Sequence, residues 1–175
     1  MEELFLRVPD EGDEAAVMEY RAEYLAHGDE PNGMSNLGGV ERYADFLAHF
    51  RAYARKECCP PGFVPGTQYL AVRESDGRVV GMLNFRHELN PRLLETGGHA
   101  GYSVRPSERG RGYAAQMVEL LKPIARQMGI PRLLITCDRE NLASARTIQK
   151  VGGVLEDERW DEADGRWTQR YWVQL

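Results

Sequence analysis

The sequence has little cysteine and no long hydrophobic run, and each shortage excludes a class of protein. The 175 residues include three cysteines, Cys58, Cys59 and Cys137. An odd number with one adjacent pair forms no disulfide framework and lacks the spacing of a zinc site. No stretch approaches the roughly 18 apolar residues that identify a transmembrane helix. We therefore expect neither a membrane partner nor a structural metal.

The first residues are also short of basic side chains. Met1 to Leu6 read Met-Glu-Glu-Leu-Phe-Leu, which lacks the basic start of a signal peptide. Together with the unpaired cysteines, this favours a reducing, cytoplasmic location.

Charge is unevenly distributed along the chain. The net charge of −5 disfavours nucleic acid as the main partner. Residues 1–65 carry a net charge of −7, whereas residues 101–150 carry +5. The basic segment suits an anion, and the acidic one suits either a cationic substrate or a solvated surface. A hydrophobic content of 42% and this length predict one globular domain over residues 1–175.

The stretch Gly98–Ala115 organises the rest of the chain. Its first half predicts a strand with three residues on each face: Ala100, Tyr102 and Val104 on one, and His99, Gly101 and Ser103 on the other. Pro106 ends this strand, and helical spacing begins at Gly112. A glycine loop that leads into a helix N-terminus exposes N–H groups, which predicts a phosphate-binding site.

Three kinds of phosphate-binding loop were compared with this stretch. A Walker A loop is excluded because no Lys-Ser or Lys-Thr pair follows the glycines. Gly110-x-Gly112-x-x-Ala115 matches the Rossmann pattern, but residues 105–109 separate it from the strand and only 60 residues follow it. A nucleotide-binding protein remains an alternative.

Periodicity and turn residues predict the remaining elements. The order is βααβββαβαββ, a mixed α+β class. The strands are expected over 4–8, 68–73, 79–88, 98–104, 132–137, 154–160 and 166–173, and the helices over 13–27, 40–56, 112–128 and 142–150. Pro123 should kink the third helix. Residues 28–39, 58–66 and 89–97 are expected to be loops, the second either lining a substrate site or only connecting.

The third kind of loop rests on a resemblance. Arg109-Gly110-Arg111-Gly112-Tyr113-Ala114 resembles the R/Q-x-x-G-x-G/A signature of the GNAT acetyltransferase superfamily. Asn141-x-x-Ser144 and Gly152 are similar to the N-x-x-A/S and glycine that follow in that family, and the element order agrees. The resemblance covers nearly the whole chain and is most specific from Gly98 to Gly153. Within the superfamily, His87 to Pro106 looks like a group of uncharacterised bacterial acetyltransferases.

The resemblance implies a fold and an activity. The fold is a central, mostly antiparallel twisted sheet of about seven strands flanked by about four helices. Residues 1–97 would form largely the acceptor side, 98–153 the acetyl-CoA core, and 154–175 a C-terminal hairpin. The activity is direct transfer of acetyl from acetyl-CoA to a primary amine of a small molecule or peptide in a ternary complex, without a metal. A homodimer and a longer acyl donor are left open.

Family members also imply which residues hold acetyl-CoA. Backbone N–H groups of Tyr102, Ser103 or Val104 would lie near the thioester carbonyl. The pyrophosphate would be bound by the loop, whose residues are Arg109, Gly110, Arg111, Gly112, Tyr113 and Ala114. Asn141 would cap its helix and contact the CoA arm.

Amine attack needs a group that accepts a proton, and His99 is the first candidate. Its imidazole titrates near neutral pH, and Gly101 and Ser103 leave room beside it. A structural, hydrogen-bonded histidine is the alternative. Glu88, with His87, is the second candidate, and a surface pair at a strand end is the alternative there.

Two positions depart from the family pattern. Many members carry a tyrosine that acts as general acid seven positions after the asparagine, where this chain has Ile148. The aromatic residue that usually follows the glycine is here Gly153. We expect Ile148 to be core and Cys137 to be packed rather than nucleophilic. The leaving thiolate would then be protonated by water or another residue, or the chain would be a catalytically weak CoA-binding module.

Overall fold

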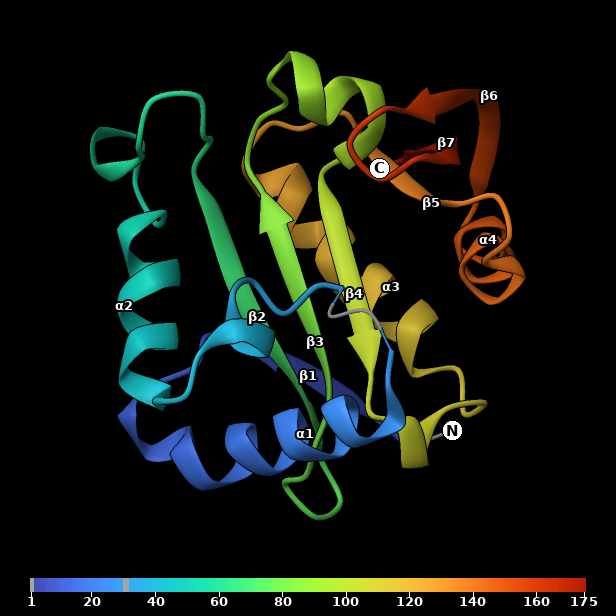
Figure 1. Cartoon of the computed structure of the whole chain (residues 1–175). Coiled ribbons are helices and arrows are strands. Elements are labelled where there is room, and N and C mark those ends of the chain that lie inside the picture. Colours follow the sequence, from blue (N-terminus) through green and yellow to red (C-terminus); the bar gives the residue numbers. More distant parts are fainter. Residues whose placement is uncertain (1, 30–31) are drawn as a thin grey trace.

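The seven strands form two sheets, and the functional cavity described below lies where the sheets meet. The computed structural model describes residues 2–29 and 32–175, and within them the order of strands and α-helices is the predicted βααβββαβαββ (Figure 1). The strands are β1 (Leu4–Arg7), β2 (Gly66–Arg73), β3 (Val79–Arg86), β4 (Ala100–Val104), β5 (Arg132–Asp138), β6 (Gly153–Asp161) and β7 (Arg166–Gln174). The α-helices are α1 (Glu14–His27), α2 (Tyr43–Ala52), α3 (Tyr113–Gln127) and α4 (Leu142–Lys150).

Every strand pairing in the two sheets is antiparallel. One sheet has the order β1-β2-β3-β4 and the other the order β5-β7-β6. β4 and β5 are neighbours but share no ladder, so the edge of each faces a gap. The predicted single sheet of about seven strands is therefore split between β4 and β5.

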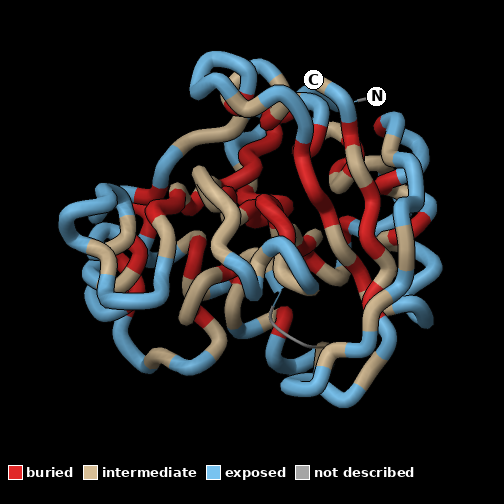
Figure 2. Tube along the Cα trace, turned by 90° about the horizontal axis from the view of Figure 1, so that it is seen from above, coloured by how far each residue is buried: buried red, intermediate tan, exposed pale blue. Residues whose placement is uncertain are grey.

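The first sheet separates two apolar cores. Alternating residues of β2 and β3 point to opposite faces. Leu70, Val72 and Met82 pack with the buried residues of α1 and α2. Ala71, Val80 and other residues of these strands pack instead with α3, α4 and the second sheet. Figure 2 shows the buried segments running through the middle of the molecule.

Most predicted boundaries agree with the structure to within two residues, but two regions differ. α2 covers Tyr43–Ala52 instead of 40–56, because Arg42 is extended and the chain leaves the helix at Tyr53. Residues 89–97, expected as a loop, contain a π-helical turn at Leu93–Gly97 that the Asn90 side chain starts by accepting from Leu93 N–H. As predicted, Pro123 lies inside the third helix, α3. Residues 30 and 31 of the predicted 28–39 loop lie outside the described residues.

His99 joins the two sheets at the point where they begin to diverge. Its backbone N–H donates to Leu134 O at 2.7 Å, and the Leu134 N–H donates to His99 Nδ1 at 2.9 Å. The imidazole nitrogen thus replaces a backbone carbonyl oxygen as the acceptor for Leu134 N–H. Gly98, with φ +66°, allows the close approach, because a Cβ there would lie 2.8 Å from Leu134 O.

This contact makes stability depend on pH. Burial, with a smaller effect of Arg86, lowers the pKa of the His99 imidazole from 6.5 to about 4. The folded state therefore favours the neutral ring, and its contribution is complete above the unfolded-state pKa and is lost as the pH falls from about 6.5 to about 4. The loss amounts to at most about 3 kcal/mol.

We therefore compare His99→Asn, whose Oδ1 can accept from Leu134 N–H, with wild type. Between about pH 7 and pH 4, the free energy of unfolding should fall by up to about 3 kcal/mol more in wild type than in His99→Asn. His99→Ala, which leaves a buried N–H unpaired, should lose about 1–3 kcal/mol at pH 7. Urea unfolding at several pH values measures both. Equal pH dependence of wild type and His99→Asn would contradict this role.

Candidate active site

A cavity of about 1090 Å³ occupies the gap between β4 and β5. One end lies at the N-terminus of α3, and the other at the turn between β6 and β7. Among the residues that line it are Tyr102, Ser103, Val104, Arg109, Gly110, Gly112, Ala114, Cys137, Asp138, Asn141, Ser144, Asp161 and Asp164. Most of the predicted cofactor-binding residues are thus brought together along one wall.

The α3 end of the cavity has the features of an anion site. Gly110 and Gly112 have φ values of +77° and +82°, which turn the chain so that it enters α3 at Tyr113. The first N–H groups of a helix have no intrahelical acceptor, and the helix dipole favours negative charge there. A phosphate group bound here would accept hydrogen bonds from these N–H groups and would be stabilised by the helix dipole.

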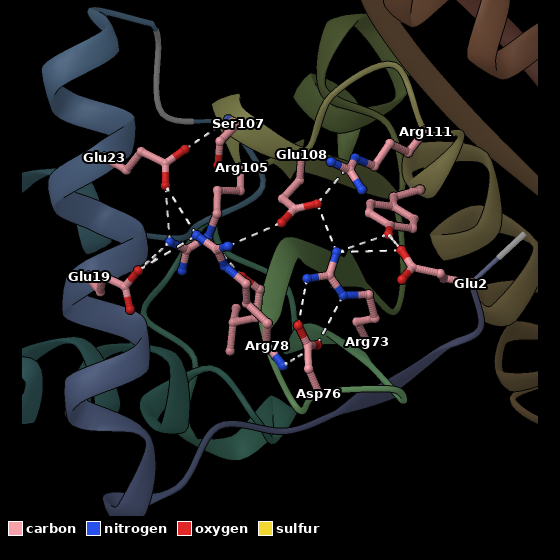
Figure 3. Close-up of polar contacts among 12 residues, drawn as sticks. Glu2, Glu19, Glu23, Arg73, Asp76, Arg78, Arg105, Ser107, Glu108 and Arg111 are labelled. Atoms are coloured by element: carbon pink, nitrogen blue, oxygen red, sulfur yellow. Dashed lines mark hydrogen bonds and ion pairs between the residues drawn. The ribbon is translucent and has the colours of Figure 1, made fainter.

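A network of ion pairs around the buried Glu108 carboxylate fixes this loop to the first sheet. Glu108 is 4% exposed, and its carboxylate contacts the guanidinium groups of Arg73 at 2.8 Å, Arg78 at 3.3 Å and Arg111 at 3.4 Å (Figure 3). Arg73 also donates to the Tyr113 hydroxyl at 3.2 Å. The loop and the start of α3 are therefore fixed to the turn between β2 and β3.

A second part of the network ties the loop to α1. Arg105 is 1% exposed, and its guanidinium contacts Glu19 at 2.9 Å and Glu23 at 3.0 Å (Figure 3). Glu23 also accepts from the Ser107 N–H at 2.8 Å. Carboxylates thus balance the basic residues on this side of the loop.

The two loop arginines differ in direction. Arg109 forms an ion pair with Asp29 and lies over the Tyr24 ring, 5.6 Å from its centroid. Arg111 is about half exposed and stays beside Glu108. Arg109 lines the cavity, whereas Arg111 is not among the described residues that do.

In the middle of the cavity, one edge of the β4 backbone faces the gap, and there Val104 O accepts from Arg109 Nε at 3.2 Å. Arg105 N–H donates to Val80 O at 2.8 Å, which fixes the phase of the ladder between β4 and β3. In an antiparallel pair, alternate residues point to opposite edges, so Ser103 faces β3 while Tyr102 and Val104 face the gap. Of the three residues predicted to offer an N–H near a thioester, the geometry favours Tyr102 and Val104.

Two hydroxyl groups and one thiol lie close together where β4, β5 and α4 border the cavity. The hydroxyl oxygens of Tyr102 and Ser144 are 3.0 Å apart. Burial raises the pKa of Tyr102 to about 12 and that of the nearby Cys137 thiol to about 11, so both keep their protons at neutral pH. Asn141 caps α4, because its Oδ1 accepts from Ser144 N–H at 3.0 Å.

The other end of the cavity is acidic. Asp138, Asp161 and Asp164 line it from the end of β5 and the hairpin turn. Asp29, which follows α1, lies instead at the α3 end of the cavity, where it pairs with Arg109. Arg166 lies 3.4 Å from Asp138 and 3.2 Å from Asp164. Asp161 accepts from the turn, and its pKa is held below the ordinary value by hydrogen bonds from Thr96 and the turn backbone, which outweigh burial.

The two residues predicted as bases lie elsewhere. Neither His99 nor Glu88 is among the described residues that line the cavity. The Nδ1 lone pair of His99 is already used by Leu134 N–H, and Glu88 pairs with Lys56 at 3.0 Å on the surface. His87 Nε2 lies 2.8 Å from Thr67 Oγ1. The structural alternative stated for each residue fits the geometry better than catalysis does.

Ile148 and Gly153 form one packing unit. Ile148 is fully buried on the inner face of α4, as predicted, with Ala145 and Val151. A Cβ at Gly153 would lie 2.4 Å from Ile148 Cγ2. Cys137, expected to be packed, is 9% exposed and also borders the cavity.

Sequence reasoning missed residues whose partners are distant in the chain. No role was predicted from the sequence for Glu108, which lies beside the glycine loop, or for Asp161 and Asp164, which lie between the last two predicted strands. Only their acidic character could have marked them. The proline-rich segment 58–66, considered for the substrate side, contributes no residue to the lining.

The described part of the chain contains no group of three or more His, Cys, Asp or Glu side chains arranged to hold a metal ion. In the same residues, no helix combines the length and apolar character required to cross a membrane.

Comparisons with known proteins agree with this arrangement. Residues 3–154 match the profile of the family described as acetyltransferase (GNAT) domain. A sequence comparison with curated proteins finds no match.

Several solved structures share the fold. RimJ from Mycobacterium smegmatis, in complex with CoA-disulfide, has a TM-score of 0.74 and 20% identity, covering 98% of this chain and 82% of that one. The Salmonella typhimurium acetyltransferase that modifies the N-terminal serine of ribosomal protein L7/L12 has a TM-score of 0.70 and 20% identity, covering 98% and 95%. The putative acetyltransferase yncA from Salmonella typhimurium, with acetyl-CoA, has a TM-score of 0.62 and 20% identity, covering 98% and 92%.

Replacing Gly112 tests the anion site. Gly112→Val introduces a branched side chain at φ +82° and should move the N–H groups of the loop, so acetyl-CoA affinity measured by calorimetry should fall at least about tenfold. Gly129→Val is the matched control. Gly129 has φ +76° and open space around it after α3, so the same strain arises outside the cavity. Wild-type affinity in Gly112→Val would exclude this loop.

Replacing Ile148 tests its role in the core. Ile148→Tyr overfills the space beside Gly153 and should lower the free energy of unfolding by about 1–3 kcal/mol without raising turnover. Ile148→Leu should cost less than about 1.5 kcal/mol. Thermal unfolding and an acetyl-transfer assay measure the two effects. A large gain in turnover would show that a missing phenol on α4 limits the reaction.

Proposed function

Because the chain belongs to the GNAT acetyltransferase family, we propose that it transfers acetyl from acetyl-CoA to a cationic primary amine of a small molecule or peptide. One observation carries the proposal. A single cavity joins an anion-binding loop to an acidic end across the gap between β4 and β5. Both substrates can therefore meet at the edge of β4 that faces the gap, in one ternary complex.

The basic end would hold the CoA pyrophosphate. N–H groups of Gly110, Arg111, Gly112 and Ala114 bind its oxygens, and Arg109 adds charge once it releases Asp29. The pantetheine arm lies along β4, and Asn141 meets it from α4. Backbone N–H groups of Tyr102 or Val104 then stabilise the negative charge that forms on the thioester oxygen.

The acidic end would hold the amine as an ammonium ion. Asp161 and Asp138 lie on the side of the gap away from the α3 loop, and a carboxylate that stays charged attracts a cation. A neutral amine is needed for attack, so one proton passes to water between these carboxylates. The nitrogen then bonds to the carbonyl carbon.

The lining fits the proposed division of the domain only in part. Residues 98–153 would supply the CoA side, but they also contain Asp138 of the acceptor side. From residues 1–97, Tyr24 and Asp29 contact Arg109 and therefore border the CoA end. The acceptor site thus draws on Asp138 and on the hairpin 154–175. A peptide N-terminus, like the one modified by the Salmonella enzyme of similar fold, and a small diamine both suit it.

The test is thiol release from acetyl-CoA with a panel of amines that includes spermidine, tyramine and a peptide with a free N-terminal serine. We expect release above hydrolysis with at least one cationic amine. Asp161→Asn keeps an oxygen for the turn N–H groups but removes the charge, so KM for that amine should rise roughly 10- to 100-fold. Glu162→Gln, one position along the same turn and outside the lining, is the matched control and should leave KM unchanged.

Absence of thiol release with every amine, in protein that binds acetyl-CoA, would instead support the catalytically weak CoA-binding module. An unchanged KM in Asp161→Asn would remove this residue from the acceptor site.

A further inference from the structure

We infer that Gln68 is a positioning residue for acetyl transfer: through Gly33, it holds the peptide that carries the Tyr102 N–H in a fixed orientation toward the gap. The inference rests on the proposed function, in which this N–H stabilises negative charge on the thioester oxygen. It adds to the reaction a residue of β2 that is not among the described residues that line the cavity.

The peptide between Gly101 and Tyr102 is the part of β4 most able to change its orientation. Gly101 has no side chain, and its backbone can adopt conformations that other residues avoid. On one side Gly101 lies opposite Asn84 of β3, but the other side of β4 faces the gap. An N–H that stabilises a transition state works best when its direction is fixed before the reaction. This peptide therefore needs support from outside the ladder.

Gly33 supplies that support, because its backbone packs directly against the peptide. A Cβ on Gly33 would lie 2.4 Å from Tyr102 Cα, 2.6 Å from Tyr102 N and 2.7 Å from Gly101 O. A Cβ on Gly101 would in turn lie 3.4 Å from Gly33 N. The two backbones approach this closely because neither glycine carries a side chain. With Gly33 in this place, the peptide cannot rotate without displacing it.

Gln68 fixes the place of Gly33. Its Nε2 donates to Gly33 O at 2.9 Å and lies 3.2 Å from Leu83 O. Its Oε1 accepts from Asn84 Nδ2 at 3.3 Å. The Gln68 side chain is fully buried, where an amide is costly unless its polar atoms are hydrogen-bonded. Here both polar atoms are bonded, so the amide has one well-defined position.

Apolar packing alone would hold the same segment without setting its direction. Met34 and Leu37 follow Gly33 and are buried in the core formed with α1 and α2. Such contacts keep the segment on the core but are non-directional, whereas a hydrogen bond sets both a distance and an angle. The bond from Gln68 is therefore the contact that determines where Gly33 meets β4.

The test measures the thioester carbonyl itself. Acetyl-CoA with an isotopically labelled carbonyl carbon is bound to the protein without an amine, and its infrared stretching band is recorded. A hydrogen bond to the oxygen lowers the stretching frequency. In Gln68→Met, which removes the amide at similar side-chain length, the band should be broader and lie at higher frequency than in wild type. Gln116→Met is the matched control and should leave the band unchanged, because the Gln116 amide donates to Glu2 O at 2.9 Å outside the described lining.

The kinetic effect should be confined to kcat. In Gln68→Met, kcat should fall about tenfold or more, because a misdirected N–H mainly loses transition-state stabilisation. KM for the amine and the affinity for acetyl-CoA should stay within about threefold of wild type, since the hydrogen bonds of Gln68 lie away from the acidic end and the α3 loop. Partial unfolding would instead lower the amount of active protein and leave the band of the bound fraction unchanged.

Replacing Gly33 tests the other half of the contact. Gly33→Ala places a methyl group against the β4 peptide at φ +69°, so kcat should fall about tenfold or more and the band should move as in Gln68→Met. Gly62→Ala is the matched control. Gly62 has φ +85° and its carbonyl also accepts from a side-chain amide, that of Asn90 at 2.9 Å, but a Cβ there has open space around it. Equal effects of the two alanine variants would show general strain and overturn the inference.

Failure of this inference is distinct from failure of the proposed function. If wild type binds no acetyl-CoA, the proposed function falls and the inference with it. If wild type binds acetyl-CoA but transfers acetyl to no amine, the carbonyl band alone decides the inference. If wild type transfers acetyl and Gln68→Met keeps the wild-type band, the inference is wrong while the proposed function stands. Should Gln68→Met not fold, Asn84→Ala, which frees the Gln68 amide, decides by the same band, and an unchanged frequency overturns the inference.

Discussion

The missing ladder between β4 and β5 is the constraint on which the rest of the structure depends. Neighbouring strands normally satisfy each other's N–H and C=O groups, and unpaired buried groups are costly. Here the strands are joined only at one end, where His99 supplies a ring nitrogen to Leu134 N–H and Gly98 admits the close approach. Beyond that point Tyr102 and Val104 turn their backbone groups toward the gap, where Val104 O accepts from Arg109 Nε. A neutral imidazole is needed to hold the junction, and the same bond that makes His99 structural occupies the lone pair that a base would use.

The distribution of charge favours opposite ends of the cavity for the two proposed substrates. The N–H groups at the start of α3 attract anions, but the arginines around them are largely neutralised from below by Glu108, Glu19 and Glu23. This network fixes the loop before any ligand arrives, so less ordering free energy is lost on binding. Arg109 is the exception, since it lines the cavity and pairs there with Asp29, which follows α1. A bound phosphate group would compete with Asp29 for the Arg109 guanidinium.

The sequence predicts what depends on near neighbours. Helical spacing predicted α3 and α4, and alternation predicted β4 and β5, because each element carries its own periodic apolar face. The glycine loop could also be predicted, because its glycines and the helix that follows them are adjacent in the sequence. The role of His99 was not, because it depends on a strand 35 residues away, and its small neighbours suggested an open site. The acceptor carboxylates were missed because nothing in a turn sequence shows which cavity the turn borders.

The two departures from the family pattern lead to one physical argument about the leaving group. Ile148 fills the space that a side chain at Gly153 would need, so the inner face of α4 is apolar and closely packed. A hydroxyl that reaches the sulfur must then come from the first turn of α4 or from the opposite wall. Tyr102 meets Ser144 there and also directs its backbone N–H into the gap. A displacement of β4 would therefore move the Tyr102 N–H away from a ligand in the gap. The contact between His99 and Leu134 resists this displacement, because it fixes one end of β4 to β5.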